Sequence, residues 1–329
     1  MPTLRLVMMG TGEFALPTFV GLCNTEHLVA ALYTQPDRTG PGRHQGHANP
    51  MRQHALERGI PVFQPVQVNA PDALSQIQEL HPDVLVVAAY GQILSSALLA
   101  LPRLGAINVH ASLLPKYRGA APVAYAILHG ESETGVSIIQ ILPRLDAGPI
   151  LATAQTPIGA LETAGELEDR LAQLAVPLIP PVLAELAAGT ARPISQSDSM
   201  ATRAPKLTKE MGAIDWSRSA AEIDCQVRAL QPWPKAYTWV ETPGKPRHRI
   251  VVLEVRPARA SSDSVPPPGT VVSLETEGLG VQTGSGPVEL VRVQPDGKRG
   301  MTGGDYLRGN RVQPGHRLHA AASSDPVAP

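Results

Sequence analysis

The densest group of residues able to do chemistry lies in the segment GAINVHASLLPKYRGAAP, residues 105–122. Asn108 and His110 are two residues apart, so in an extended strand their side chains point to the same face. An amide donor beside an imidazole can stabilise the negative oxygen that forms when a nucleophile adds to a carbonyl, and the imidazole can hold or pass a proton. This pair therefore indicates acyl or formyl transfer.

A third candidate is Asp146, in the Gly-containing turn LDAGPI that follows the apolar run VSIIQIL. A carboxylate near His110 would fix the tautomer of the ring and favour its protonated form. Each residue also has a purely structural interpretation: Asn108 as a turn cap, His110 as a hydrogen-bonded core histidine, and Asp146 as an ordinary turn residue. Spacing in the sequence does not show whether Asp146 and His110 touch.

The elements that must position these residues alternate between strands and helices. Apolar runs predict strands, with helical stretches between them, at residues 4–10, 28–34, 61–63, 84–89 and 106–109. Such alternation predicts an α/β fold: a Rossmann-like, mostly parallel sheet with helices on both faces. Asn108 and His110 then lie at the carboxyl end of a strand, where open parallel sheets bind their ligands.

The first turn, GTGEFA at residues 10–15, matches the loose dinucleotide pattern G-x-G-x-x-A. The acidic residue expected roughly 20 positions further on would be near Asp37. Asp37, however, belongs to the loop sequence PDR and not to a strand end. A tight turn into the first helix, which glycine permits without any ligand, explains the pattern better.

A long helical stretch at residues 161–189 begins with a capping box, Thr163 and Glu166. Because helix-interior prolines remove a hydrogen-bond donor and clash with the preceding turn, Pro177, Pro180 and Pro181 predict a kink or two shorter helices. These elements complete a catalytic domain at residues 1–189, and the polar, proline-containing residues 190–209 suit a linker.

The second half of the chain changes its period. After a helix at residues 220–230 come the short runs RIVVLEV, GTVVSL, LGVQT and PVELVRVQP, separated by Gly and Pro turns. Regular short strands with turn signals predict a small, OB-like β-barrel domain at residues 210–318. Residues 319–329 have little to bury and are predicted to be a disordered tail.

Composition narrows the class of protein. The formal net charge is −1, and Cys23 and Cys225 are too few and too far apart for a disulfide framework or a thiolate metal site. The ten histidines show no metal-ligand spacing either. Every apolar run is interrupted well short of the roughly 20 residues that span a bilayer. We therefore predict a cytoplasmic protein with no metal and no membrane partner.

The segment INVHASLLPKYRGAAP resembles the signature of the folate-dependent formyltransferases. The resemblance implies that Asn108 and His110 flank the formyl carbon and that Asp146, in its DAG turn, completes the reacting centre. It also implies that two loops bind the folate. The folate-site residues are Ser112, Leu113, Leu114 and Pro115 of SLLP, with Tyr90, Gly91, Gln92 and Ile93 of VVAAYGQIL on the pterin side.

Other segments resemble one branch of that family, which formylates initiator methionyl-tRNA. They are MGTGEFALP, TQPDRTGPGR, PKLTKEMGAIDW and QPWP. The resemblance implies 10-formyltetrahydrofolate as the formyl donor, the free α-amine of methionyl initiator tRNA as the acceptor, and no metal. We expect a monomer.

Two regions are implied to bind the tRNA. In this branch the long loop at residues 35–50 lies against the acceptor stem, with Arg43 in the place of its key arginine and Arg38 nearby; here GRHQGH replaces the commoner GRGKK and lacks two lysines. Formal charge changes from −5 over residues 1–200 to +5 over residues 201–318. The cations we place along the tRNA path are Lys206, Lys209, Arg247, Arg249, Lys298 and Arg299.

Three other functions share some of these features. A formyltetrahydrofolate hydrolase would use the same Asn, His and Asp with water as the nucleophile, but would not explain the long loop and the cationic barrel. A sugar-nucleotide formyltransferase shares the catalytic signature and a similar second domain, but the PDR-x-x-x-GR loop argues against it. A non-catalytic tRNA-binding protein would not need all three reacting residues.

Overall fold

The computed structural model describes residues 3–37, 49–242, 246–261, 264–274 and 278–320. The chain forms two compact units. Unit 1 comprises residues 1–122, 133–157 and 166–205, and unit 2 comprises residues 123–132, 158–165 and 206–329. Residues 123–132 and 158–165, which we predicted in the first domain, cluster with unit 2.

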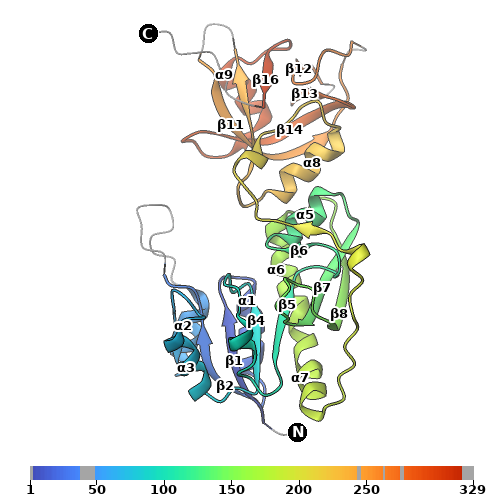
Figure 1. Cartoon of the computed structure of the whole chain (residues 1–329). Helices are drawn as coiled ribbons and strands as arrows, with labels where there is room; N and C mark the ends of the chain where they lie inside the picture. The colour runs from blue at the N-terminus through green and yellow to red at the C-terminus, as the bar shows by residue number, and fades with distance from the viewer. Residues whose placement is uncertain (1–2, 38–48, 243–245, 262–263, 275–277, 321–329) are drawn as a thin grey trace. The chain divides into compact units, whose positions relative to one another are not determined.

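Unit 1 is built on one seven-stranded sheet with the order β3-β2-β1-β4-β5-β7-β8 (Figure 1). Five of its strands are parallel to one another: β1 (Arg5–Gly10), β2 (Leu28–Tyr33), β3 (Val62–Phe63), β4 (Val84–Ala88) and β5 (Ala106–His110). Two antiparallel strands extend the sheet beyond β5, namely β7 (Glu133–Gln140) and β8 (Ile150–Pro157). The prediction of a mostly parallel sheet is confirmed.

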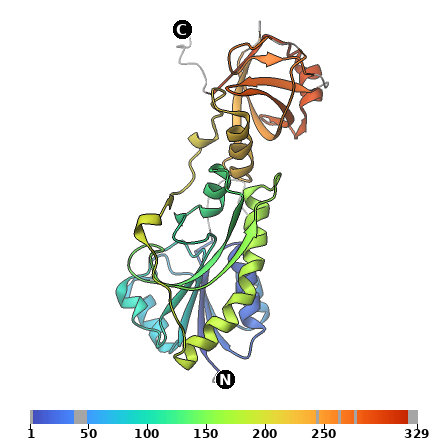
Figure 2. The same cartoon turned by 90° about the vertical axis from the view of Figure 1, so that its right-hand side faces the viewer.

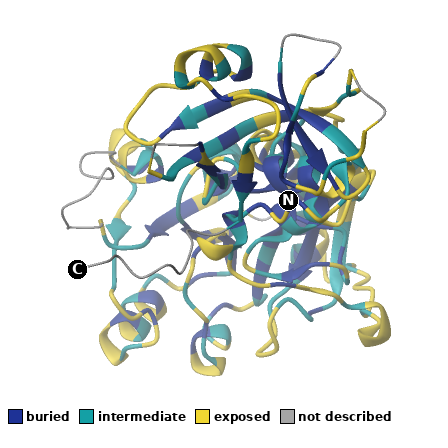
Figure 3. Ribbon diagram, turned by 90° about the horizontal axis from the view of Figure 1, so that it is seen from above, coloured by how far each residue is buried: buried dark blue, intermediate teal, exposed yellow. Residues whose placement is uncertain are grey.

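Helices cover both faces of this sheet. Successive strand residues point to opposite sides, so a strand that is apolar throughout needs a helix on each side to bury its side chains. On one face Val7 and Met9 of β1 share a buried cluster with Ile77 of α3 (Pro71–Glu79) and Leu98 of α4 (Ser96–Leu99). On the other, α1 (Ala15–Cys23) contacts β1, β2, β4 and α2 (Pro50–Glu57). The strands are accordingly buried and the outer helix faces exposed (Figure 3).

The long helical stretch predicted at residues 161–189 is two helices, as the prolines indicated. A 3₁₀ turn, Val176–Leu178, joins α6 (Ala164–Ala175) to α7 (Ile179–Ala188), and the three follow one another beside the sheet in Figure 2. The run Ala164–Ala188 is long and apolar enough to cross a membrane, contrary to our expectation from the sequence. Leu167, Leu171 and Leu183 of this run are buried within the protein.

The prediction of a linker at residues 190–209 needs correction, because most of this segment is part of unit 1. Ile194 pairs with Ile150 at the edge of β8, and β9 (Arg203–Ala204) pairs in parallel with β6 (Arg118–Gly119). Its polar and proline residues suggested a free connection, whereas Gln196, Asp198 and Thr202 make specific tertiary hydrogen bonds. Unit 1 ends at Pro205.

Unit 2 contains the predicted small barrel. Its strands follow the order β12-β13-β14-β11-β10-β16, with β15 on β14, and a bridge between Thr270 and Arg317 connects the two ends of this order. The strands are β10 (Ala236–Glu241), β11 (His248–Pro257), β12 (Val271–Val272), β13 (Leu279–Thr283), β14 (Gly286–Pro295), β15 (Met301–Thr302) and β16 (Arg317–His319). Their inner residues pack with α8 (Ala220–Ala229) and α9 (Gly303–Asn310).

Sequence periodicity found most of the longer elements but missed β8, β10, α9 and β16. β8 alternates half-buried and exposed residues and has no continuous apolar run, and β10 follows the proline-rich QPWPK directly. The tail predicted at residues 319–329 lies outside the described residues from residue 321 onward, and His319 ends β16.

Candidate active site

Asn108 and His110 lie on β5, separated by Val109, so they share one face of the strand. Asn108 is opposite Val87 of β4 on one side and Ile139 of β7 on the other. This is the point at which the sheet changes from parallel to antiparallel. His110 is only 5% exposed, so the pair sits at the carboxyl end of a central strand inside unit 1.

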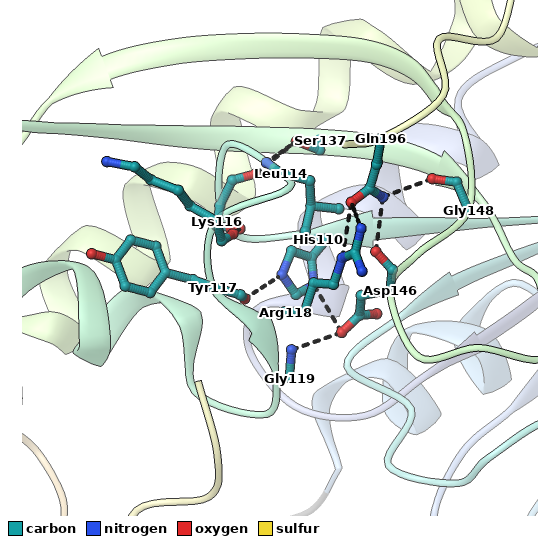
Figure 4. Close-up of polar contacts among 11 residues, drawn as sticks. His110, Leu114, Lys116, Tyr117, Arg118, Gly119, Ser137, Asp146, Gly148 and Gln196 are labelled. Carbon is teal, nitrogen blue, oxygen red and sulfur yellow. Dashed lines mark hydrogen bonds and ion pairs between the residues drawn. The ribbon is translucent and has the colours of Figure 1, made fainter. Parts of the chain in front are cut away.

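The His110 ring has one nitrogen committed to the backbone and one facing a carboxylate (Figure 4). Nε2 lies 2.9 Å from the carbonyl oxygen of Tyr117, and because a carbonyl only accepts, Nε2 carries the hydrogen. Nδ1 lies 3.8 Å from Oδ2 of Asp146, beyond direct hydrogen-bond distance. Nδ1 is therefore the ring atom free to exchange a proton.

Asp146 reaches His110 because the β7–β8 connection turns back toward the end of β5. β7 itself ends beside the start of β5, where Gln140 pairs with Ile107. The carboxylate is held by the backbone N–H of Gly119, which donates to Oδ2 at 2.8 Å. Asp146 has a left-handed backbone, φ 48°, which is uncommon for a residue with a side chain.

The Asn108 amide is half-buried, and within the described part of the chain it makes no hydrogen bond. Because this amide is partly exposed and bonds to no described protein group, it is available to an external oxygen. A proton-exchanging imidazole, a carboxylate and a free amide donor thus converge at one strand end. This arrangement suits the addition of a nucleophile to a carbonyl.

The SLLP loop after β5 is shaped by its own hydrogen bonds. The Ser112 hydroxyl donates to the carbonyl of Lys116, 2.7 Å away, and the Ser137 hydroxyl accepts from the backbone N–H of Leu114 at 3.0 Å and donates to the Ser112 carbonyl. Ser112 and Leu114 are buried, whereas Leu113 and Pro115 are half-exposed. The loop's outer surface is therefore formed by Leu113, Pro115 and backbone.

A polar network behind Asp146 was missed by the sequence analysis. Gln196 donates from Nε2 to the carbonyl oxygens of Asp146 and Gly148, at 2.8 and 2.7 Å, and its Oε1 accepts from Arg118. Arg118, 8% exposed, also pairs with Asp198 at 2.9 Å. The one available signal was the arginine inside the YRGAAP segment; Gln196 and Asp198 were hidden in the predicted linker.

Comparison with known proteins agrees with this geometry. The family described as "Formyl transferase" matches residues 4–183, and the family "Formyl transferase, C-terminal domain" matches residues 206–311. A methionyl-tRNA formyltransferase of Citrifermentans bemidjiense is 42% identical over 318 residues, which cover 97% of each chain. One from Acidithiobacillus ferrooxidans is 43% identical over 314 residues, covering 95% of this chain and 98% of its own.

The chain belongs to the methionyl-tRNA formyltransferase family.

Solved structures share the fold with this member of the methionyl-tRNA formyltransferase family. An N-formyltransferase from Helicobacter canadensis, solved with folinic acid and dTDP-3-aminofucose, has a TM-score of 0.64 at 16% identity, over 89% of this chain and all of its own. HypX from Aquifex aeolicus, solved with tetrahydrofolic acid, has a TM-score of 0.61 at 16% identity. The match covers 93% of this chain but only about half, 47%, of HypX.

The loop after β4, predicted to face the pterin, divides into supporting and exposed residues. Tyr90 is 2% exposed and belongs to the unit 1 core, where burial raises its pKa to about 12. The Gln92 side chain accepts from the N–H of Val68 at 2.8 Å and donates to the carbonyl of Pro65, so it braces the loop. Gly91, at φ 84°, and Ile93, 80% exposed, are the two that face outward.

Two further residues of this methionyl-tRNA formyltransferase family member brace the same loop and were missed. Gln35 donates from Nε2 to the carbonyl of Tyr90 at 2.8 Å, and Asn69 donates to the carbonyl of Ile93 at 2.8 Å. Gln35 lies just after β2 and Asn69 just before α3, and no local sequence pattern identifies either residue. They hold the backbone of the loop in one conformation.

The predicted tRNA contacts lie in unit 2 or outside the described residues. Arg38 and Arg43 are among the latter. Lys206, Lys209, Lys298 and Arg299 are exposed. Arg247 pairs with Glu241 at 2.6 Å, and Arg249 pairs with Asp296 at 3.1 Å and lies over the Tyr237 ring, 5.2 Å from its centroid.

Four of these cations gather at one end of the barrel. Arg247 and Arg249 lie at the start of β11, and Lys298 and Arg299 lie in the turn that follows β14. The backbone N–H of Asp296 bonds to the carbonyl of Arg249, which joins the two segments. Among the described residues no group of three or more His, Cys, Asp and Glu is placed to hold a metal ion.

Proposed function

We propose that this chain transfers the formyl group of 10-formyltetrahydrofolate to the free α-amine of methionyl initiator tRNA, giving N-formylmethionyl-tRNA for translation initiation. The observation that carries the proposal is the unpaired Asn108 amide beside the His110–Asp146 pair, in a chain 42–43% identical to methionyl-tRNA formyltransferases over nearly its whole length.

The first step is attack of the neutral α-amine on the formyl carbon. A C–N bond forms and the carbonyl electron pair moves onto oxygen, which becomes negative. We assign the Asn108 amide as one hydrogen-bond donor to this oxygen, and Nδ1–H of His110, when protonated, as the second. Donors already in place at the developing charge stabilise the transition state without reorganisation.

Asp146 and His110 handle the protons. The amine gives up one proton, which we assign to the Asp146 carboxylate directly or through water. The bond between the formyl carbon and N10 of the folate then breaks, N10 takes up one proton, and tetrahydrofolate leaves. The 3.8 Å between Nδ1 and Oδ2 of Asp146 places the two proton carriers next to each other.

The folate lies, in this proposal, along the two loops at the carboxyl ends of β4 and β5. The residues that offer surface to it are Gly91, Ile93, Leu113 and Pro115. Ser112, Leu114, Tyr90 and Gln92 maintain the shape of those loops through the bonds and burial described above. Parallel sheets commonly bind their ligands at this edge.

The tRNA contacts are assigned to the 35–50 loop and to the basic end of the barrel formed by Arg247, Arg249, Lys298 and Arg299. The lysines absent from GRHQGH leave Arg43 as the main cation of the loop. Replacing Arg43 with Ala should raise the KM for tRNA while the KM for folate stays unchanged. Unchanged tRNA kinetics would remove the loop from the proposed interface.

The assay that tests the function incubates the purified chain with 10-formyltetrahydrofolate and one of three acceptors. These are charged initiator methionyl-tRNA, an amino-sugar nucleotide and water alone. Formylation of the methionyl-tRNA supports the proposal. Formylation of the sugar alone, or release of formate without transfer, overturns it in favour of the sugar-nucleotide enzyme or the hydrolase.

The monomeric state and the cytoplasmic location stay predictions. Size-exclusion chromatography with light scattering measures the first, and cell fractionation measures the second. A stable dimer would contradict the first prediction.

A further inference from the structure

One segment of unit 1 bonds to Asp146 and also to Tyr117, the residue whose carbonyl accepts from His110. We call residues 194–204 the strap. It runs from the pairing of Ile194 with Ile150 to the pairing of β9 with β6. Between these two points, its side chains and backbone bond to the loops that carry Asp146 and Tyr117.

On the Asp146 side, the strap acts through Gln196. Its Nε2 donates to the carbonyls of Asp146 and Gly148 at 2.8 and 2.7 Å (Figure 4). These two bonds hold the backbone of the DAG turn at the residue with φ 48°. A residue with a side chain keeps a left-handed backbone only where its surroundings hold that conformation. The two bonds therefore fix the backbone from which the Asp146 carboxylate extends.

On the His110 side, the strap acts through Thr202. Its hydroxyl accepts from the N–H of Tyr117 at 2.8 Å, and its carbonyl accepts from the N–H of Arg118 at 2.9 Å. Tyr117, at φ 63°, is the residue whose carbonyl receives the His110 Nε2–H. Both partners of the pair are therefore oriented by backbone that the strap holds.

The orientation of Gln196 is decided by its neighbours. Arg118 only donates and the two carbonyls only accept, so Oε1 must face the guanidinium and Nε2 the carbonyls. Arg118 is nearly buried, and Asp198 balances its charge at 2.9 Å. A buried, ion-paired guanidinium is a fixed anchor, because moving it would leave an unpaired charge.

We propose that Gln196 is a positioning residue for the transfer reaction: its two backbone bonds set the distance and angle between the Asp146 carboxylate and His110 Nδ1, and Arg118 fixes Gln196. The inference rests on the proposed function. It assigns catalytic importance to a segment that touches neither the formyl group nor, in the proposed binding mode, either substrate.

Two variants separate the positioning role of the Gln196 hydrogen bonds from the effect of side-chain size. Gln196→Glu keeps the size and the acceptor toward Arg118 but cannot donate to the carbonyls, and Gln196→Met keeps the size without either bond. Displacement of a reacting group by about 1 Å costs up to 100-fold in rate. We expect kcat to fall about 10- to 100-fold in both variants, with both KM values within about threefold of the parent.

A double-variant cycle with Asp146→Asn gives the readout that a merely structural role would not move. If Gln196 acts through Asp146, adding Gln196→Glu to Asp146→Asn lowers kcat by less than about threefold, because the carboxylate it positions is already gone. Full additivity of the two losses would overturn the inference. So would a wild-type kcat in both single variants.

Gln226 provides the matched control. Its Nε2 also donates to two backbone carbonyls, those of Met211 and Ala213, at 2.8 and 3.0 Å, but in unit 2. Gln226→Glu should lower thermal stability while kcat per folded molecule stays at the parent value. If the parent chain fails to formylate methionyl-tRNA, the proposed function fails; if it succeeds and Gln196→Glu matches Gln226→Glu in kcat, only this inference fails.

Discussion

Replacing Asn108 with Ala is the most direct perturbation of the proposed reacting centre. Within the described residues the Asn108 amide has no hydrogen-bond partner, so its removal leaves no buried group unsatisfied. Orphaning a partner is the costly part of most polar deletions, about 1–3 kcal/mol, and that cost is absent here. We expect the free energy of unfolding to change by less than about 1 kcal/mol.

The rate should change far more than the stability. Removing one donor from an oxyanion site lowers kcat about 100- to 1000-fold, equivalent to about 2.7–4 kcal/mol of transition-state stabilisation. The measurement is single-turnover formylation of methionyl-tRNA at saturating donor, with a thermal melt of the same sample. KM values should move little, because the bond is made to the transition state and not to the bound substrates.

Asn24→Ala serves as the control, since Asn24 is exposed at the end of α1 and, among the described residues, its side chain accepts only from the exposed Arg58 side chain. It should leave kcat at the parent value. The reasoning is refuted if Asn108→Ala keeps kcat within about threefold of the parent. It is also refuted if the loss of rate follows a loss of folded protein, because Asn108 would then be a structural residue.

Three further outcomes follow from the structure. Gly119 has φ 129°, and a Cβ there would lie 2.4 Å from the Ala204 carbonyl oxygen, so Gly119→Ala should destabilise unit 1 by about 1–3 kcal/mol in urea unfolding and lower kcat as well. Burial raises the pKa of the Asp83 carboxyl, but hydrogen bonds from a backbone amide and from Arg103 outweigh it and bring the pKa below its ordinary value of 3.8. The ionised form therefore stabilises the fold above pH 3.8, and this stabilisation is lost as pH falls through the lower folded pKa. Asp83→Asn should be less stable than the parent near neutrality, by under about 1 kcal/mol because the Asp83–Arg103 pair is partly solvated. The stabilities of the variant and the parent should converge in acid unfolding. Ser219 caps α8 in a capping box, so Ser219→Ala should lower the stability of unit 2 by about 1 kcal/mol, seen as a lower Tm with kcat per folded molecule unchanged.

Local patterns predicted the fold class and most of its elements because the signals are local. The strands of the parallel sheet are continuous apolar runs, and the prolines between α6 and α7 forbid a single regular helix. β8 and β10 were missed because strand formation there depends on the neighbouring strand, which a short mixed sequence does not reveal.

The linker shows the limit of composition as a guide. Polar residues with prolines are typical of free connections, yet the side chains of Gln196 and Thr202 in this segment form hydrogen bonds with the backbone of unit 1. The residues next to a side chain in the sequence do not indicate which distant group it will hydrogen-bond. The same composition is compatible with a solvated connection and with a bonded strap.

By itself, the sequence determined the chemistry available: an amide and an imidazole on one face of a strand, a carboxylate in a Gly-flanked turn, and the family to which these belong. Only the tertiary structure decided which atoms meet. The contacts that join His110 to Asp146, Arg118 to Gln196 and Tyr117 to Thr202 link residues 36, 78 and 85 positions apart. Such pairs become neighbours only after the sheet, its loops and the strap have packed, because a hydrogen bond depends on distance in space and not on distance along the chain.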